Sequence, residues 1–360
     1  MTRRLIAALL ALAAALSLAA CGEKSDETGA PTPESLRLML DYLPNADHAG
    51  IYQAQGGGAF EQAGLNVAIE TPADPATPLK LLVAGKVDVA ISYEPEVLLA
   101  RDQGAKVVSV GALVQRPLTS LMAVPPKRDD AKGKGKDDRS AKPAVTSVAD
   151  LAGKTVGTAG IPYQSAYLRT ILEEAGVDPA SVKEVNVGFN LVPAMLSGKA
   201  DATLGAFWNV EGIQLQREKR DPWIEPVDEA GVPPYDELVF VVREDTARTR
   251  GPVLRAFLRA VAQGHQQLRD DPAQGVEPLL DANPDLDRDA TLAQVQATLP
   301  AFFPDKEDEP FGWQDGPSWG AYGEWMFQRG LLKKRPLPRS ITNEFLPGAG
   351  LEPTDDPGSA

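Results

Sequence analysis

Residues 65–114, LNVAIETPADPATPLKLLVAGKVDVAISYEPEVLLARDQGAKVVSVGALV, decide the fold class of this chain. Short runs rich in Val, Ile and Ala predict three strands, at residues 65–69, 87–92 and 107–113. The segments between them predict two helices, at residues 79–84 and 96–103. Strands that alternate with short helices indicate βαβ units and a parallel sheet.

The same alternation continues on both sides of this stretch. Before it, the sequence predicts a strand at residues 36–40 and a helix at residues 48–60 that is interrupted at Gly56 to Gly58. After it, a second series predicts strands at residues 154–157, 182–187 and 202–206, with helices at residues 165–175 and 191–196. A strand at 238–242, a helix at 253–268 and a mainly helical region follow. The two series predict an α/β protein with two lobes.

The composition excludes several classes of function. The chain has 360 residues and a formal net charge of -14, which argues against a nucleic-acid partner because phosphates attract Lys and Arg. With one Cys and two His, the sequence predicts no intrachain disulfide, no zinc or iron–sulfur site and no metal cofactor.

The N-terminus has the pattern of an export signal. Arg3 and Arg4 precede an apolar run at residues 5–16, and Leu18-Ala19-Ala20-Cys21 follows. This ending resembles the bacterial lipobox, in which Cys21 would be lipidated and become the new N-terminus. The alternative is a transmembrane anchor, but the run is shorter than the ~20 residues that span a bilayer. We therefore expect an exported protein that a lipid anchors to the periplasmic or outer face of a membrane.

Composition also suggests the domain boundaries. The charged stretch at residues 125–144 has too few apolar side chains to form a core, so we expect a disordered surface insertion, although its basic part could contact anionic lipid headgroups. We expect hinges near residues 118–124 and 237–239. The predicted parts are a signal peptide (1–20), a flexible tether (21–35), the first lobe (36–124), the insertion (125–144), the second lobe (145–237), a return to the first lobe (238–348) and a disordered tail (349–360).

Candidate ligand-binding residues follow the predicted strands. Open α/β sheets bind ligands at the carboxyl ends of their strands, and with two lobes these ends face a shared cleft that closes by a hinge motion. His48, in the first helix, could donate to a ligand or could only pack. The other candidates are Asp41, Tyr42, Asn45, Tyr93, Glu94, Gln115, Tyr163, Trp208, Asn209, Glu211 and Tyr235.

The chemistry of these candidates favours one class of ligand. Aromatic rings can stack on a planar heterocycle, and carboxylates accept hydrogen bonds from its amino group or protonated ring nitrogen. A sulfonate, nitrate or phosphate site would need Arg, Lys or helix N-termini, and Arg116 is the only cation near the predicted strand ends. We therefore expect a planar nitrogen heterocycle that carries amino donors.

Several motifs carry a resemblance to a known family. The sequence from about residue 36 to residue 347 resembles the thiamine pyrimidine-precursor (formylaminopyrimidine/hydroxymethylpyrimidine) binding proteins of ABC importers, which are related to fungal pyrimidine-precursor synthases. The motifs are DYLPNADHAGIY (41–52), ISYEPEVLLA (91–100), VGALVQRPL (110–118), GAFWNVEG (205–212) and TNEFLP (342–347). Tyr42 stands where a tryptophan is common in the family, so ring stacking there would be less extensive.

The resemblance implies a two-lobed periplasmic binding protein fold of type II, a monomer, a permease and its ATPase as partners, and an aminopyrimidine ligand. The ligand contacts that it implies are Asp41, Asn45, Tyr93, Glu94, Trp208, Asn209, Glu211 and Tyr235.

Two alternatives remain open in the sequence. One is a binder of a sulfonate, nitrate or bicarbonate anion in the same fold, which would need cations in the cleft. The other is a pyrimidine-precursor synthase, because Lys86 lies in a segment comparable to the pyridoxal phosphate-binding segment of the fungal enzymes. Their cysteine-rich motif has no counterpart here, since Cys21 is the only cysteine. We therefore expect a binding protein that is not an enzyme and needs no cofactor.

Overall fold

A computed structural model describes residues 33–125, 145–336 and 339–348 of the chain. The predicted signal peptide, the lipidation site Cys21, most of the tether, residues 126–144 of the insertion and the predicted tail lie outside these described residues. Within them, no helix is long and apolar enough to cross a membrane.

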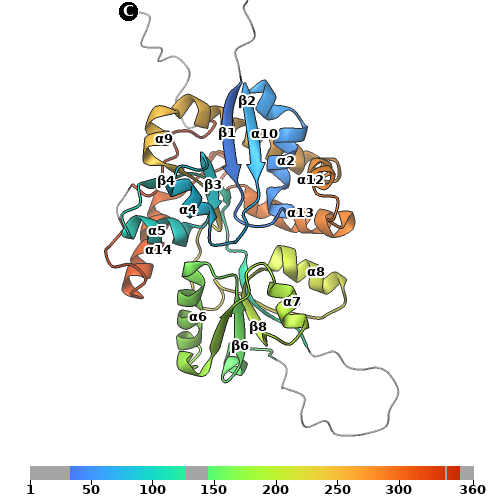
Figure 1. Ribbon diagram of the computed structural model, residues 1–360, viewed down its shortest axis with the longest axis vertical. Coiled ribbons are helices and arrows are strands. Elements are labelled where there is room, and N and C mark those ends of the chain that lie inside the picture. Colours follow the sequence, from blue (N-terminus) through green and yellow to red (C-terminus); the bar gives the residue numbers. More distant parts are fainter. Residues whose placement is uncertain (1–32, 126–144, 337–338, 349–360) are drawn as a thin grey trace, which may run out of the picture. The chain divides into compact units, whose positions relative to one another are not determined.

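The first sheet has five strands in the order β2-β1-β3-β10-β4 (Figure 1). Strand β1 pairs in parallel with β2 and β3, whereas β10 runs antiparallel between β3 and β4. The strands are β1 (Glu34–Met39), β2 (Leu65–Glu70), β3 (Val89–Ser92), β4 (Val107–Val114) and β10 (Leu238–Arg243). We call this sheet and its helices the first lobe.

The second sheet also has five strands, in the order β7-β6-β8-β5-β9. Strand β6 pairs in parallel with β7 and β8, and β5 runs antiparallel to both β8 and β9. The strands are β5 (Thr119–Ala123), β6 (Thr155–Thr158), β7 (Lys183–Asn186), β8 (Ala202–Phe207) and β9 (Trp223–Pro226). This sheet and its helices form the second lobe.

The prediction of a parallel sheet is only partly correct, because each sheet also contains antiparallel strands. Strands β10 and β5 each enter a sheet directly from the other lobe, so no βαβ crossover constrains their direction. Strands β5 and β9 were not predicted. Since β5 belongs to the second sheet, the chain changes lobe at residues 115–118, earlier than the boundary at residue 124 that we drew from the sequence.

The chain crosses between the lobes twice, and one side chain joins the two crossings. Buried Glu237, just before β10, accepts hydrogen bonds from the backbone N–H groups of Leu118 (2.6 Å) and Thr119 (2.8 Å). Its carboxylate also accepts from the hydroxyl groups of Thr119 (2.9 Å) and Tyr235 (3.0 Å). The two crossings are thus held side by side, and the hinge motion itself stays a prediction.

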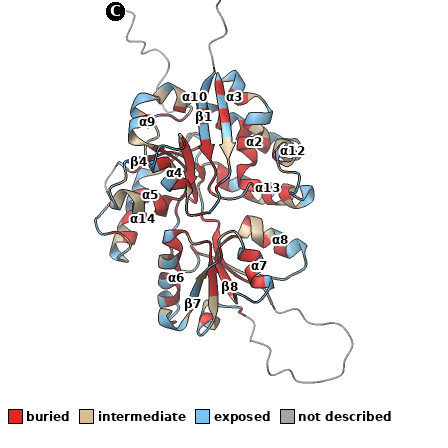
Figure 2. Ribbon diagram, in the orientation of Figure 1, coloured by how far each residue is buried: buried red, intermediate tan, exposed pale blue. Residues whose placement is uncertain are grey.

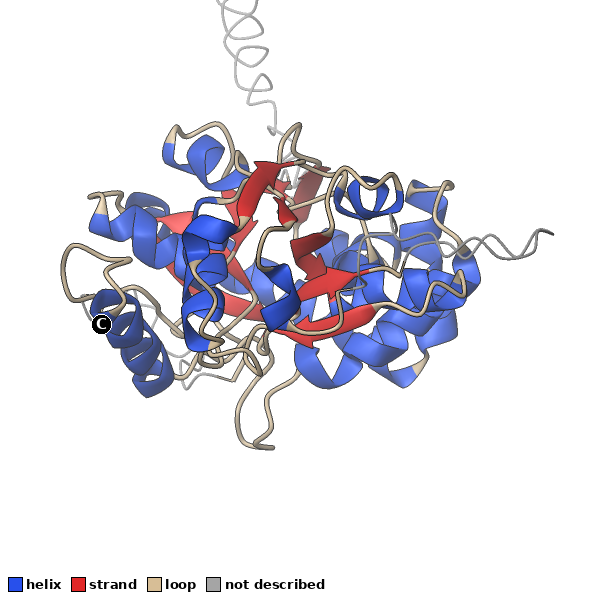
Figure 3. Ribbon diagram, turned by 90° about the horizontal axis from the view of Figure 1, so that it is seen from below, coloured by secondary structure: helices blue, strands red, loops and turns tan. Residues whose placement is uncertain are grey.

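The helices lie along both sides of the strands (Figure 3). In the first half of the chain they are η1 (Ala46–His48), α2 (Ala49–Gly56), α3 (Ala59–Gln62), α4 (Pro78–Val83) and α5 (Glu94–Asp102). In the second lobe they are η2 (Val148–Leu151), α6 (Pro162–Glu174), η3 (Pro179–Ser181), α7 (Leu191–Leu196), η4 (Trp208–Gly212) and α8 (Ile213–Arg217). The remainder are α9 (Glu244–Thr249), α10 (Gly251–Asp270), α11 (Pro272–Gly275), α12 (Glu277–Ala282), α13 (Arg288–Phe302) and α14 (Gly316–Gln328).

The core consists of strands and of the helix faces that cover them (Figure 2). All residues of β3, β4 and β5 are buried, as expected for strands that are covered on both faces. Helix α10 packs so closely on α2 that a Cβ on Gly264 would lie only 2.2 Å from the carbonyl oxygen of Gly50. This rigid framework positions the loops that follow the strands.

Candidate functional site

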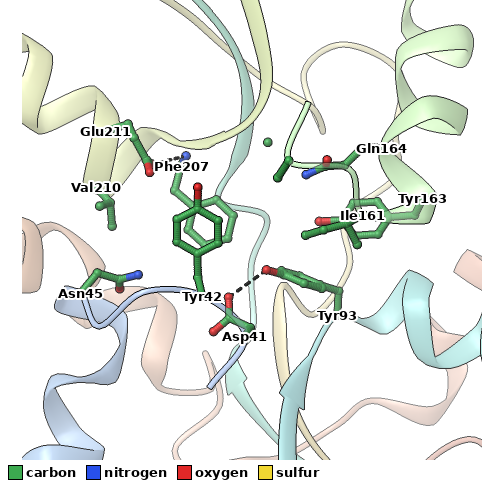
Figure 4. Close-up of a pocket in the computed structure, with 12 residues that line it drawn as sticks. Asp41, Tyr42, Asn45, Tyr93, Ile161, Tyr163, Gln164, Phe207, Val210 and Glu211 are labelled. Atoms are coloured by element: carbon green, nitrogen blue, oxygen red, sulfur yellow. Dashed lines mark hydrogen bonds between the residues drawn. The ribbon is translucent and has the colours of Figure 1, made fainter. Parts of the chain in front are cut away.

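A pocket lies between loops of the two lobes and encloses about 350 Å³ of empty space, including the part that is open to solvent (Figure 4). The lining residues are Asp41, Tyr42, Asn45, Tyr93, Ala159, Ile161, Tyr163, Gln164, Gly205, Phe207, Val210 and Glu211. Six predicted candidates are therefore brought together: Asp41, Tyr42, Asn45, Tyr93, Tyr163 and Glu211.

The loop after β1 supplies three of the lining residues, and Asn45 shapes that loop. The side-chain oxygen of Asn45 accepts from the backbone N–H of Asp47 (2.8 Å) and so caps the short helix η1. Its amide group donates to the carbonyl oxygen of Leu43 (3.2 Å). Asn45 thus fixes the backbone that presents Asp41 and Tyr42 to the pocket.

Asp41 is 1% exposed and is held by two neutral donors. The Tyr93 hydroxyl donates to one carboxylate oxygen (2.8 Å), and Nε2 of His48 lies 2.9 Å from the other. Because Nδ1 of His48 accepts from the backbone N–H of Asn45 (3.2 Å), the ring proton is on Nε2, which donates to Asp41. In this arrangement neither partner brings a positive charge to the Asp41 carboxylate.

Glu211 provides a second carboxylate from the other lobe. It lies on the π-helical turn η4 after β8, and one of its oxygens accepts from the backbone N–H of Phe207 (2.7 Å). Burial raises the pKa of Glu211 to about 7, although the hydrogen bond from Phe207 opposes the rise. Burial, with the nearby charges of Glu211 and Asp41, also raises the pKa of Tyr42. Tyr42 therefore keeps its hydroxyl proton beside the two carboxyl groups of the pocket.

Aromatic rings from the two lobes meet beside these carboxyl groups. Tyr42 contacts Phe189 edge-to-face, with ring centroids 4.7 Å apart, and Tyr93 lies 5.3 Å from Tyr163. In Figure 4, the rings of Tyr42, Tyr93 and Tyr163 lie around the same space as Asp41. Their faces and edges make the pocket suitable for a flat ring.

The lining contains no Lys, Arg or His among the described residues. Arg116, the only cation among the candidates after the strands, instead pairs with Asp305 and is half-exposed. Within the described ranges, no group of three or more His, Cys, Asp or Glu residues could hold a metal ion. The site is thus rich in hydrogen-bond acceptors and has no cation in its wall to receive an anion.

Trp208 and Asn209 do not line this pocket, although both lie on η4 next to residues that do. The indole N–H of Trp208 donates to the carbonyl oxygen of Pro117 (3.1 Å), in the first crossing between the lobes. The amide group of Asn209 donates to the Asp47 carboxyl (2.6 Å) and lies 2.6 Å from the Thr298 hydroxyl. All three residues of this interlobe contact are fully buried.

Three further candidates lie outside the lining, as does His48. Glu94 accepts from the backbone N–H of Asp236 (2.8 Å), and burial beside Asp236 raises its pKa. Tyr235 donates to Glu237, and Nε2 of Gln115 is buried with no partner in the described part of the chain. The ligand roles of all the candidates, inside and outside the lining, stay predictions.

Six lining residues were not predicted. Ala159, Ile161, Gly205, Phe207 and Val210 are apolar or small, so their side chains gave no chemical signal in the sequence. Gln164 lies in the first turn of α6, one residue beyond the predicted Tyr163. Extending the search after each strand by one helical turn would have found it.

The fold and this pocket define a class of protein. A small pocket between two α/β lobes at the carboxyl ends of their strands is the architecture of the periplasmic binding proteins. The alkanesulfonate-binding protein SsuA from Xanthomonas axonopodis pv. citri is similar in structure, with a TM-score of 0.63 and 20% sequence identity. The likeness covers 87% of this chain and 99% of that chain. The two-lobed periplasmic binding protein fold predicted from the sequence is confirmed.

The chain belongs to the NMT1/THI5 like family, which it matches over residues 45–134 and 138–275. A formylaminopyrimidine-binding protein of Halalkalibacterium halodurans is 35% identical over 327 residues, 90% of this chain and 92% of that protein. A 4-amino-5-hydroxymethyl-2-methylpyrimidine phosphate synthase of Legionella pneumophila is 27% identical over 268 residues, 74% of this chain and 79% of that protein. The predicted resemblance is confirmed.

Proposed function

We propose that this protein is the substrate-binding component of an ABC importer and that it captures an aminopyrimidine of the thiamine-precursor type. The formylaminopyrimidine-binding relative, which is more similar to this chain than the Legionella pneumophila synthase, and the periplasmic binding protein fold support a role as a solute-binding protein and not an enzyme. The observation that carries the choice of ligand is the pocket wall, which has two carboxyl groups and three tyrosine rings and no cation among its lining residues.

Asp41 is the group that would bind the amino end of the ligand. Its two hydrogen-bond donors, His48 and Tyr93, orient the carboxylate and leave it further lone pairs for a ligand donor. A buried carboxylate without a cationic partner is costly, so a ligand with an amine and a protonated ring nitrogen would offset that cost. An anionic ligand would instead increase the repulsion.

The remaining groups would orient the ring and enclose it. The tyrosine rings offer flat apolar contact, and Glu211 offers a second acceptor from the opposite lobe. Because Asp41 and Glu211 belong to different lobes, a ligand that contacts both would hold the lobes together. The interlobe contact of Asp47, Asn209 and Thr298 would add to the stability of that closed arrangement.

The proposal includes the location and partners of the protein. We infer export to the periplasm or the outer membrane face, a lipid on Cys21, and delivery of the ligand by a monomer to a permease with its ATPase. The Leu18-Ala19-Ala20-Cys21 pattern supports the anchor. Changing Cys21→Ala should move the protein from the membrane fraction to the soluble fraction, and retention in membranes would contradict lipidation.

A ligand panel tests the proposed function. Thermal-shift measurements of the purified protein should show stabilisation by 4-amino-5-hydroxymethyl-2-methylpyrimidine and by its formylamino analogue, because a ligand that binds only the folded state raises the melting temperature. Ethanesulfonate, nitrate and bicarbonate are the comparison ligands and should give no shift. Stabilisation by an anion and not by a pyrimidine would reject the proposal.

A further inference from the structure

Gln164 is a buried polar side chain at the pocket whose oxygen has no partner. It is 1% exposed, and Oε1 has no hydrogen-bond partner in the described part of the chain. Figure 4 shows its amide end directed toward the pocket with the nitrogen nearer the central space, and a rotation of the terminal amide group would turn the oxygen toward a ligand. A buried acceptor without a donor is destabilising, so a donor on the ligand would remove that penalty.

Gly205 provides the space that this amide occupies. A Cβ on Gly205 would lie 2.3 Å from Nε2 of Gln164 and 3.1 Å from its Cδ, which no side chain could tolerate without displacing the amide. The backbone of Gly205 also has φ +112°, a conformation that residues other than glycine rarely adopt. The glycine and the glutamine therefore form one structural unit, with the amide held at the pocket wall.

The chemistry of this unit differs from that of the carboxyl groups. Asp41 and Glu211 are suited to a cationic or strongly polarised amino group. The Gln164 amide is neutral and offers an acceptor oxygen beside a donor NH₂, which matches a neutral N–H group, above all one that belongs to another amide. The pocket thus presents charged acceptors and a separate neutral acceptor to different parts of one ligand.

We propose that Gln164, in the space left by Gly205, is a specificity-determining residue that binds a neutral N–H on the substituent of the pyrimidine ring. This role rests on the proposed function, since it assumes that the carboxyl groups bind the amino end of the same ligand. Gln164 then distinguishes ligands that share the aminopyrimidine ring and differ only in that substituent.

Isothermal titration calorimetry with two pyrimidines tests this role. One ligand carries a formylaminomethyl group on the 4-amino-2-methylpyrimidine ring, and the other carries a methyl group at the same position. The purified wild-type protein should bind the formylaminomethyl ligand at least about 10-fold more tightly, because the methyl ligand leaves Oε1 without a donor. Gln164→Met should reduce the ratio to below about 3-fold and leave the affinity for the methyl ligand nearly unchanged.

Two further variants keep this test decisive. Gln164→Glu retains an acceptor oxygen at the same length and should retain most of the preference. Gln216→Met, on an exposed residue of α8, is the matched control and should behave as wild type. Equal binding of both ligands by the wild type, or equal weakening of both by Gln164→Met, would overturn the role of Gln164 alone. Absence of binding of either pyrimidine would instead reject the proposed function.

Discussion

Asp41 and Asp47 are two buried carboxyl groups on the same loop, and their surroundings differ. Asp41 faces the pocket and is held by His48 and Tyr93, which leave it open to a ligand. Asp47 lies behind the pocket, where Asn209 and Thr298 contact one of its oxygens and the other has no partner in the described residues. Burial raises the pKa of Asp47 well above its usual range. One loop therefore serves both ligand recognition and contact between the lobes.

The same division occurs on the facing segment after β8. Phe207, Val210 and Glu211 line the pocket, whereas Asn209 joins the interlobe contact. Polar residues within one motif therefore have different roles. If the division is correct, changes on the pocket side should mainly alter ligand affinity and selectivity, and changes behind the pocket should mainly alter the stability of closure.

The largest effect is expected at Asp41. Asp41→Asn keeps the shape of the side chain and removes its charge, so affinity for the aminopyrimidine should fall about 100-fold, since hydrogen bonds to charged groups contribute about 1.5–3 kcal/mol. Calorimetric titration measures the loss, and Asp308→Asn, on an exposed residue, is the control. A loss below about 5-fold with an unchanged melting temperature would remove Asp41 from the ligand contacts.

Glu211→Gln tests how much the second carboxyl group destabilises the ligand-free protein. The folded-state pKa of Glu211 is about 7, above its usual value of 4.5, so its contribution to stability is greatest at low pH and is lost as the pH rises toward 7. Replacement by neutral Gln should therefore stabilise the protein by about 1.5 kcal/mol more at pH 8 than at pH 4.5, less than the full shift implies because the side chain is partly exposed.

Urea unfolding of wild type and variant at the two pH values measures this difference. Glu218→Gln, at the exposed residue that directly follows helix α8, controls for a general loss of negative charge. A stability difference between wild type and Glu211→Gln that does not change with pH would show that burial does not perturb this carboxyl group. Ligand affinity at pH 8 should fall in the same variant, because its acceptor is no longer charged.

Variants of Tyr42 and Trp208 compare an aromatic ring that lines the pocket with one that does not. Trp208 was an aromatic candidate in the sequence, but its indole N–H donates to the Pro117 carbonyl oxygen and the residue does not line the pocket. Tyr42→Ala should weaken binding about 20-fold because the ring contact is lost, and Tyr42→Phe should be nearly neutral because it keeps the ring and removes only the hydroxyl. Trp208→Ala should weaken binding less than about 5-fold. The reverse order, measured by calorimetry, would restore Trp208 to the site.

A modest effect on affinity, with a clear effect on ligand dissociation, is expected at the interlobe contact. Asn209→Ala removes the donor to Asp47, so the closed arrangement should lose stability and affinity should fall about 5-fold, mainly through faster ligand dissociation. Stopped-flow measurement of dissociation separates this effect from a loss of ligand contact. Asn66→Ala, on an exposed position of β2, is the control. An unchanged dissociation rate would show that the contact does not support closure.

Much of the fold could be predicted from the sequence because strand and helix periodicities are local. The mixed direction of the sheets could not, since β5 and β10 join their sheets through distant pairing across the two crossings. Asp41, Tyr42, Asn45, Tyr93, Tyr163 and Glu211 could be found because strand ends gather at one edge. The directions in which the Trp208 and Asn209 side chains point depend on the π-helical turn η4, and no sequence pattern predicts such a turn.

A crystal structure of the protein with 4-amino-5-hydroxymethyl-2-methylpyrimidine would show directly which side chains bind the ligand. We expect the ring to lie among Tyr42, Tyr93 and Tyr163, with its amino group within about 3.2 Å of the Asp41 or Glu211 carboxylate. Asn209 should remain on Asp47 and out of contact with the ligand. A pyrimidine bound away from both carboxylates, or stacked on Trp208, would contradict this expectation.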